Sequence, residues 1–163
     1  MGLQPFESVV AEHGAVVLRV CRAVVGPVDA DDAWSETFLS ALRAYPRLRP
    51  DSDVRAWLVT IAHRRALDVV RARGRAPVPV AAPGRDAVAP DVADPDPADP
   101  ALAAAVAALP DKQRHAVAYR YLADLAYADI AALLGGTEAA ARRSAADGIA
   151  ALRRTSALTR ENP

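Results

Sequence analysis

The chain has 163 residues, an apolar share of 52% with only 5% aromatics, and equal numbers of acidic and basic side chains, so its formal charge is zero. This length allows one or two small domains with modest cores. The zero charge argues against a strongly basic domain that binds nucleic acid tightly on its own. Alanine, the strongest helix former, inflates the apolar share, and alternating β-branched runs are missing outside a Val-Pro stretch. We therefore expect an all-α protein.

The first expected helix runs from about Pro5 to Val25, because valines recur at helical spacing and Gly26-Pro27 then stops the pattern. The chain's only cysteine, Cys21, falls on the apolar face of this helix, which is typical of a core residue rather than a redox centre. A single cysteine allows no internal disulfide and favours a reducing compartment.

Two further helices complete a first domain over residues 1–73. An acidic helix is expected over residues 31–45, since carboxylates are favoured at a helix N-terminus. A third helix is expected over residues 53–73, with Ser52 or Asp53 as its N-cap. The expected core consists of apolar residues that recur at helical spacing in both helices: Trp34, Phe38, Leu42, Trp57 and Ile61.

Residues 74–100 have the composition of a linker that joins two small helical domains. Seven of the thirteen prolines lie here, together with five aspartates and two arginines. Such a Pro/Asp-rich segment favours extended conformations over a packed core. The zero net charge therefore hides an acidic connector between two slightly basic ends.

The second domain, over residues 101–163, is expected to contain four helices. One helix is expected over residues 101–109 and another over residues 110–122, where proline opens the helix without losing a needed N–H group. Val117 and Tyr121 are the expected buried residues of this second helix.

The end of this domain has the spacing of a helix-turn-helix. A helix over residues 127–134 ends at Gly135-Gly136, and Thr137 can cap a longer helix over residues 138–154. The expected inward positions are Ile130, Leu133, Leu134, Ala141, Ala145, Ile149 and Leu152. The residues then exposed, where a recognition helix meets base edges and phosphates, are Thr137, Glu138, Ala140, Arg142 and Arg143. The spacing alone is also that of a plain helical hairpin, so both interpretations remain open.

Two sets of short motifs carry a family resemblance. In the first domain they are Asp29-Ala-Asp-Asp-Ala-Trp-Ser-Glu-Thr-Phe38, Ala56-Trp57-Leu58, Ile61-Ala62, Asp68 and Arg71. In the second they are Asp111-Lys-Gln-Arg114, Tyr127-Ala-Asp-Ile-Ala131, Leu133-Leu-Gly135 and Leu152-Arg153. In these motifs the chain resembles an extracytoplasmic-function (ECF) sigma factor, a promoter-recognition subunit of bacterial RNA polymerase.

The resemblance implies a factor that binds core RNA polymerase and promoter DNA, with an anti-sigma factor as a further partner that the family suggests. It assigns polymerase binding to Asp29, Asp31, Asp32, Ser35, Glu36 and Phe38. It assigns contact with the opened −10 element to Trp57, Thr60, His63, Arg64, Arg65 and Arg71, with His63 solvated or facing DNA. It assigns the −35 duplex to Thr137, Glu138, Ala140, Arg142, Arg143 and Ser144. The linker would be either a solvated spacer or, as in the family, a segment threaded through the polymerase cleft.

The sequence contains no catalytic pattern. The three histidines are scattered without a second ligand at metal spacing, and a phosphate loop or paired nucleophile is missing. We therefore expect no enzyme activity, metal or cofactor. No apolar run reaches the roughly 18 residues of a membrane helix, and the N-terminus does not resemble a signal peptide. These features predict a soluble, cytoplasmic protein without membrane insertion.

Two other functions compete with a sigma factor. One is a regulatory or interaction protein that has the sigma fold and binds polymerase or a partner without initiating transcription. Ser35, Arg64 and Asp147 keep it open, because the family usually has other residues there. The other is a free-standing helix-turn-helix repressor, which the low basic charge disfavours because tight duplex binding depends on many phosphate contacts.

Overall fold

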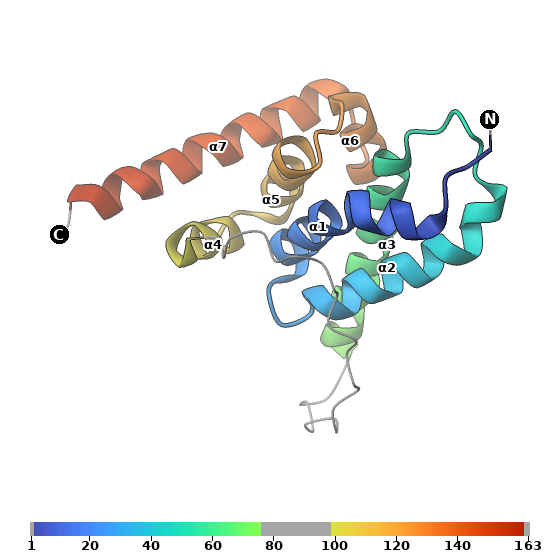
Figure 1. Ribbon diagram of the computed structural model, residues 1–163. Coiled ribbons are helices and arrows are strands. Elements are labelled where there is room, and N and C mark those ends of the chain that lie inside the picture. Colours follow the sequence, from blue (N-terminus) through green and yellow to red (C-terminus); the bar gives the residue numbers. More distant parts are fainter. Residues whose placement is uncertain (1, 76–98, 162–163) are drawn as a thin grey trace. The chain divides into compact units, whose positions relative to one another are not determined.

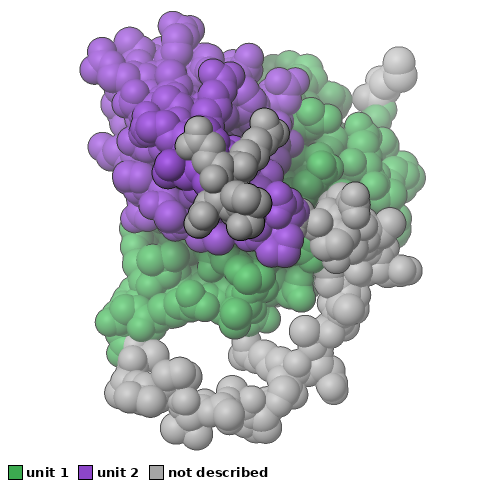
Figure 2. Space-filling model, turned by 90° about the vertical axis from the view of Figure 1, so that its left-hand side faces the viewer, with its two compact units in different colours: residues 1–93 green, residues 94–163 purple. Residues whose placement is uncertain are grey.

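The computed structural model describes residues 2–75 and 99–161, and every regular element in these two ranges is helical (Figure 1). The expectation of an all-α chain is therefore confirmed for the described residues. The chain divides into two compact units, residues 1–93 and 94–163 (Figure 2). Most of the expected linker lies outside the described residues, so its conformation stays a prediction.

Unit 1 contains three helices that each pack against the other two. They are α1 (Phe6–Val25), α2 (Ala30–Ala44) and α3 (Val54–Arg75), with a short 3-10 turn, η1 (Tyr45–Arg47), after α2. Gly26 ends α1 with a φ of 83°, a conformation that favours glycine. Asp53 caps α3, since its Oδ1 accepts the N–H of Ala56 at 3.0 Å. These two signals explain why the expected helix ends are close to the observed ones.

Aromatic rings and one hydrogen bond join the helices of unit 1. Trp34 donates its indole N–H to the carbonyl of Gly14 at 2.9 Å and so ties α2 to α1. The ring of Phe6 lies edge-on to those of Phe38 and Tyr45, with centroids 6.4 and 5.2 Å apart. Such contacts add to the energy of apolar burial. Of the expected core residues, Phe38 is therefore buried, and Trp34, Trp57 and Ile61 are partly buried.

The prediction that Leu42 lies in this core is wrong, because its side chain is 51% exposed while Ala41 is fully buried. Four residues span slightly more than one helical turn, so each such step rotates the side chain by about 40°. The line from Trp34 through Phe38 has therefore turned away from the core when it reaches Leu42.

Unit 2 consists of α4 (Pro100–Ala107), α5 (Asp111–Val117), a π-helical turn η2 (Ala118–Leu122), α6 (Tyr127–Leu134) and α7 (Glu138–Glu161). Thr137 caps α7, since its Oγ1 accepts the N–H of Ala140 at 3.1 Å. Helix α7 continues past the expected end at Arg154 because glycine and proline do not recur until Pro163. The observed bounds of α6 are those expected from the sequence.

The π-helical turn changes which tyrosine is buried. Tyr121 was expected inside but is 58% exposed, whereas Tyr119 is fully buried. The N–H of Ala123 donates to the carbonyl of Ala118 at 3.3 Å, a five-residue step instead of the usual four. The wider turn shifts the inward face, so the α-helical spacing from Val117 to Tyr121 no longer applies.

Helices α5 and α7 are in close contact at Gly148. A Cβ atom added there would lie 2.6 Å from Cγ2 of Val117 and 3.3 Å from the carbonyl oxygen of Gln113. A side chain there would force Val117 or the helix backbone to shift, which accounts for a glycine inside a long helix.

Candidate polymerase and nucleic-acid interfaces

The exposed side of α2 combines carboxylates with large apolar side chains. At 100° per residue, Asp32, Ser35 and Glu36 fall on the side opposite the core. Asp32 and Glu36 are exposed and Ser35 is partly exposed. Leu39 and Leu42 lie on the same side and are 48% and 51% exposed. A partner protein would bury these two leucines between charged neighbours, as at the centre and rim of an interface.

The two leucines were not predicted as contact residues. Leu42 was assigned to the core, and Leu39 was not assigned at all. The signal was nevertheless in the sequence, because a helical wheel places Leu39 between Ser35 and Asp32 on the acidic side.

The other residues expected to bind polymerase have less free surface. Phe38 is only 6% exposed and contacts Trp34 with ring centroids 4.6 Å apart, so it supports α2 from inside unit 1. Asp29 forms an ion pair with Arg73 at the end of α3. Asp31 is partly exposed. Of the six expected residues, Asp32 and Glu36 are therefore exposed, and Asp31 and Ser35 are partly exposed.

One side of α3 brings together an aromatic side chain and two arginines. Trp57, Thr60, Arg64 and Arg71 fall within about 60° of one another around the helix axis. Arg64 and Arg71 are exposed, and Trp57 and Thr60 are partly buried. The ring of Trp57 lies 6.2 Å from that of Tyr45, which fixes its position against η1. This side can contact a nucleic-acid strand through its two cations.

His63 is not part of this surface. Its side chain is buried and the residue is only 7% exposed, so the expectation of a solvated His63 is wrong. The reason is its position on α3, one residue after the fully packed Ala62 and on the core side of the helix. DNA could reach His63 only if unit 1 opened locally.

Asp68 reduces the positive charge of the same region. Its carboxylate lies 3.3 Å from Nη1 of Arg65 and 3.9 Å from Nη1 of Arg71. Exposed pairs of this kind contribute at most about 1 kcal/mol, so either arginine can exchange Asp68 for a phosphate at small cost. Among the three expected −10 arginines on α3, Arg64 lies outside this cluster.

Two buried titratable groups in unit 1 have shifted pKa values. Burial raises the pKa of the Cys21 thiol to about 12, so the group is neutral and unreactive in the folded unit. Burial lowers the pKa of His13 below 6.5, because the opposite effect of the Glu12 carboxylate, which raises the pKa, is smaller. The Nδ1 atom of His13 is buried and has no hydrogen-bond partner among the described residues. Both groups belong to the core.

The start of α7 presents the polar surface expected of a recognition helix. Gly135 and Gly136, with φ of 75° and 119°, make the turn that follows α6. Ala141 and Ala145 are buried against the rest of unit 2. The expected −35 residues that are exposed are Thr137, Glu138, Ala140, Arg142 and Arg143, and Ser144 is partly buried. The six residues are therefore brought together at one end of one helix.

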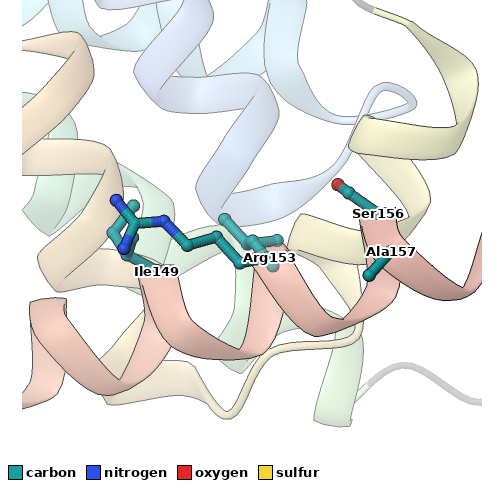
Figure 3. A pocket seen from close by; sticks show the side chains of 5 residues that line it. Ile149, Arg153, Ser156 and Ala157 are labelled. Carbon is teal, nitrogen blue, oxygen red and sulfur yellow. The ribbon is translucent and has the colours of Figure 1, made fainter.

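A hollow runs along the C-terminal half of α7. Its lining residues are Ile149, Leu152, Arg153, Ser156 and Ala157 (Figure 3). Ile149 and Leu152 were expected to face inward, and both are partly buried. The hollow lies two to three turns beyond the exposed start of α7, and it is separate from the polar residues described above.

The described residues contain no group of three His, Cys, Asp or Glu side chains that could hold a metal ion. In the same residues we find no helix whose length and apolar character would let it cross a membrane.

Comparisons with known proteins show which family this chain resembles. The chain matches the model of Sigma-70 region 2 over residues 9–76 and that of Sigma-70, region 4 over residues 100–152. The RNA polymerase sigma factor CarQ of Myxococcus xanthus is 33% identical over 153 residues, which cover 91% of this chain and 87% of CarQ.

Two solved structures have a similar fold. The structure of CnrH in complex with the cytosolic domain of CnrY gives a TM-score of 0.64 at 22% identity, covering 97% of this chain and 89% of that one. The sigma factor RpoE, in complex with the anti-sigma factor NepR from Bartonella quintana, gives 0.68 at 20% identity, covering 91% and 96%. The family matches span more than half of the sequence, and CarQ is similar along nearly all of it. The chain therefore belongs to the sigma-70 family of RNA polymerase sigma factors, as a member of the ECF type.

Proposed function

We propose that this sigma factor directs core RNA polymerase to promoters by contacting a −35 duplex with unit 2 and an opened −10 strand with unit 1. Sigma factors are transcription initiation factors without catalysis of their own, and we infer the same for this chain. In this assignment residues 1–73 bind polymerase and the −10 element, residues 74–100 form the linker, and residues 101–163 bind the −35 element.

The capped, exposed start of α7 is the observation that carries the proposal. Arg142 and Arg143 project from the helix directly after a glycine turn, where a recognition helix enters the major groove. Arginine can bind guanine or phosphate in bidentate fashion. Glu138 can accept a hydrogen bond from a cytosine amino group on the same side of the helix.

On unit 1, α2 and α3 supply two further contacts in this proposal. The side of α2 with Asp32, Glu36 and Leu39 docks on the polymerase. Arg64 and Arg71 on α3 bind phosphates of the opened −10 strand, and Trp57 supports that side of the helix by packing on η1. The chain works in the cytoplasm, where the polymerase transcribes.

We also propose that an anti-sigma factor controls this chain. Support comes from one of the solved structures of similar fold, in which the sigma factor RpoE is bound to the anti-sigma factor NepR. Purification of the chain from its own cells, followed by identification of bound proteins, would test this.

The double substitution Arg142→Ala with Arg143→Ala tests the assignment of α7. Each well-formed bidentate contact with a base contributes about 1–3 kcal/mol of discrimination, so losing the pair should lower −35-dependent transcription by roughly thirty-fold or more. Run-off transcription with reconstituted holoenzyme on genomic fragments measures this. Binding to core polymerase should stay at the wild-type level.

Arg153→Ala with Arg154→Ala is the matched control. It removes the same charge from two adjacent, exposed arginines of the same helix, about 16 Å further along its axis. This control should transcribe nearly as well as wild type. If the Arg142–Arg143 variant lost core binding, the division of roles between the units would be wrong.

The alternative is a sigma-fold regulator that binds polymerase without initiating transcription. The ion pairs that Asp68 and Glu138 make with neighbouring arginines favour it, because they reduce the charge available to DNA. Wild-type chain that binds core polymerase but yields no run-off transcript from any genomic fragment would support this function instead.

A further inference from the structure

Tyr127, the first residue of α6, lies beneath two arginines from different elements. The guanidinium carbon of Arg142, on α7, is 5.0 Å from the centre of the Tyr127 ring. That of Arg120, on the π-helical turn η2, is also 5.0 Å from the same ring centre. Both distances are within the range of cation–π attraction. One partly buried ring therefore joins the turn before α6 to the DNA-facing helix after it.

The irregular backbone before α6 holds Arg120 in this place. Nη1 of Arg120 donates to the carbonyl of Leu125 at 3.0 Å and lies 3.8 Å from the carboxylate of Asp124. Asp124 itself has a φ of 54°, a conformation that few residues other than glycine adopt. Strained residues and π-helical turns persist where the surroundings enforce them, and both are frequent at functional sites. Here they aim Arg120 at the ring of Tyr127.

Arg142 is held from two sides. Its Nη2 donates to Oε1 of Glu138 at 2.9 Å, one turn earlier on α7, while its guanidinium group lies over Tyr127. The side chains of Arg142 and Glu138 are 59% and 53% exposed, so the group remains accessible to a ligand. A flexible arginine loses rotamer entropy when it binds, and a pre-oriented one loses less.

We infer that Tyr127 is a positioning residue, which orients Arg142 for its contact with the −35 element. This inference rests on the proposed role of Arg142 in promoter recognition and adds a residue that does not itself need to touch DNA. Arg120 and the π-helical turn form the fixed side of the arrangement, and Arg142 the side that meets the duplex. An exposed cation–π contact of this kind corresponds to about a two- to five-fold effect on promoter affinity.

The test compares Tyr127→Leu with Tyr127→Phe in reconstituted holoenzyme. The DNA is the genomic promoter fragment that gives the strongest run-off transcript with wild type, together with its single-base variants across the −35 element. Tyr127→Leu removes the ring and should lower affinity about two- to five-fold, with lost discrimination at the same base positions that Arg142→Ala affects. Tyr127→Phe keeps the ring and should behave as wild type.

Tyr121→Leu is the matched control, since it makes the same change at a nearby tyrosine that is 58% exposed. It should leave the −35 preference unchanged. The decisive measurement is Tyr127→Leu in the Arg142→Ala background, where the positioning role predicts no further loss of affinity or discrimination. A purely structural role predicts the same loss in both backgrounds.

The outcomes separate this inference from the proposed function. If Arg142→Ala has no effect on −35-dependent transcription, the proposed contact fails and the role of Tyr127 fails with it. Suppose instead that Arg142→Ala is impaired. If Tyr127→Leu then has no effect, lowers affinity equally for all bases, or adds to the effect of Arg142→Ala, the positioning role is wrong. The promoter contact of Arg142 stands in each of these cases. Loss of function in Tyr127→Phe would equally refute the role of the ring.

Discussion

Replacing Gly148 by alanine sets two physical effects on α7 against each other. Inside an exposed helix, alanine is more stable than glycine by about 1 kcal/mol. At Gly148, however, the new Cβ would lie 2.6 Å from Cγ2 of Val117 and 3.3 Å from the backbone oxygen of Gln113. Val117 is only 7% exposed, its χ1 angle is restricted by branching at Cβ, and the carbonyl oxygen belongs to a helix. Overpacking in such places costs about 1–3 kcal/mol, so we expect a net loss of stability of roughly 1 kcal/mol.

The two tryptophans allow this loss to be assigned to one unit. Trp34 and Trp57 both lie in unit 1, so tryptophan fluorescence in a urea titration follows unit 1, whereas far-UV circular dichroism follows the helices of both units. The unfolding of unit 2 is therefore seen by circular dichroism and not by fluorescence. Gly148→Ala should lower the urea midpoint of this transition. The fluorescence midpoint should not move.

Two further variants make the test decisive. Ala146→Gly changes an exposed position of the same helix and should cost about 1 kcal/mol, which measures helix propensity without the clash. Combining Gly148→Ala with Val117→Ala removes the clashing methyl group, so the double variant should be more stable than the sum of the single changes predicts. If Gly148→Ala stabilises unit 2 by the amount that Ala146→Gly costs, the close approach of α5 and α7 is refuted.

Three further outcomes are expected in unit 1. Burial lowers the pKa of His13 in the folded state, so the stability that neutral His13 contributes is complete above pH 6.5 and decreases as the pH falls below 6.5. The urea midpoint of unit 1 should therefore be lower at pH 5.5 than at pH 7.5. This decrease should be smaller in His13→Leu. Cys21, with its pKa raised to about 12, should react with a thiol reagent such as DTNB only at the rate at which unit 1 opens; fast labelling under native conditions would contradict this. Leu39→Ala should weaken binding to core polymerase roughly ten-fold, while Leu158→Ala, another exposed leucine, should not; equal effects would argue against the α2 surface.

The sequence was sufficient to predict where the helices begin and where α1 and α6 end, but not where α7 ends. Gly26, the Asp53 cap and the Gly135-Gly136 turn act locally through backbone conformation and one hydrogen bond, so they are recognisable without a structure. The bounds of α6 and the start of α7 follow from such signals. The group of polar residues at the start of α7 could therefore be predicted as one exposed set.

The side to which a residue points was harder to predict. Leu42, His63 and Tyr121 were each placed on the wrong side, because small rotations accumulate along a helix and a π-helical turn adds a residue to one turn. The contacts of Tyr127 were beyond prediction for a different reason. They join three elements, and their distances depend on the backbone of the turn at Asp124, which has no sequence signal of its own.

Promoter recognition requires that the ion pairs on the candidate DNA surfaces be exchanged for contacts with bases or phosphates. Arg65 and Arg71 share Asp68, and Arg142 is paired with Glu138. In a free domain these pairs would reduce the number of phosphates neutralised and hence the counterion release that drives binding to any duplex. Exposed pairs are weak, however, and each arginine can exchange its carboxylate for a base or phosphate held in the right place. We therefore expect such a surface to bind poorly to random DNA and to bind well only when a larger partner has placed the promoter against it, as a polymerase subunit requires and a free repressor does not.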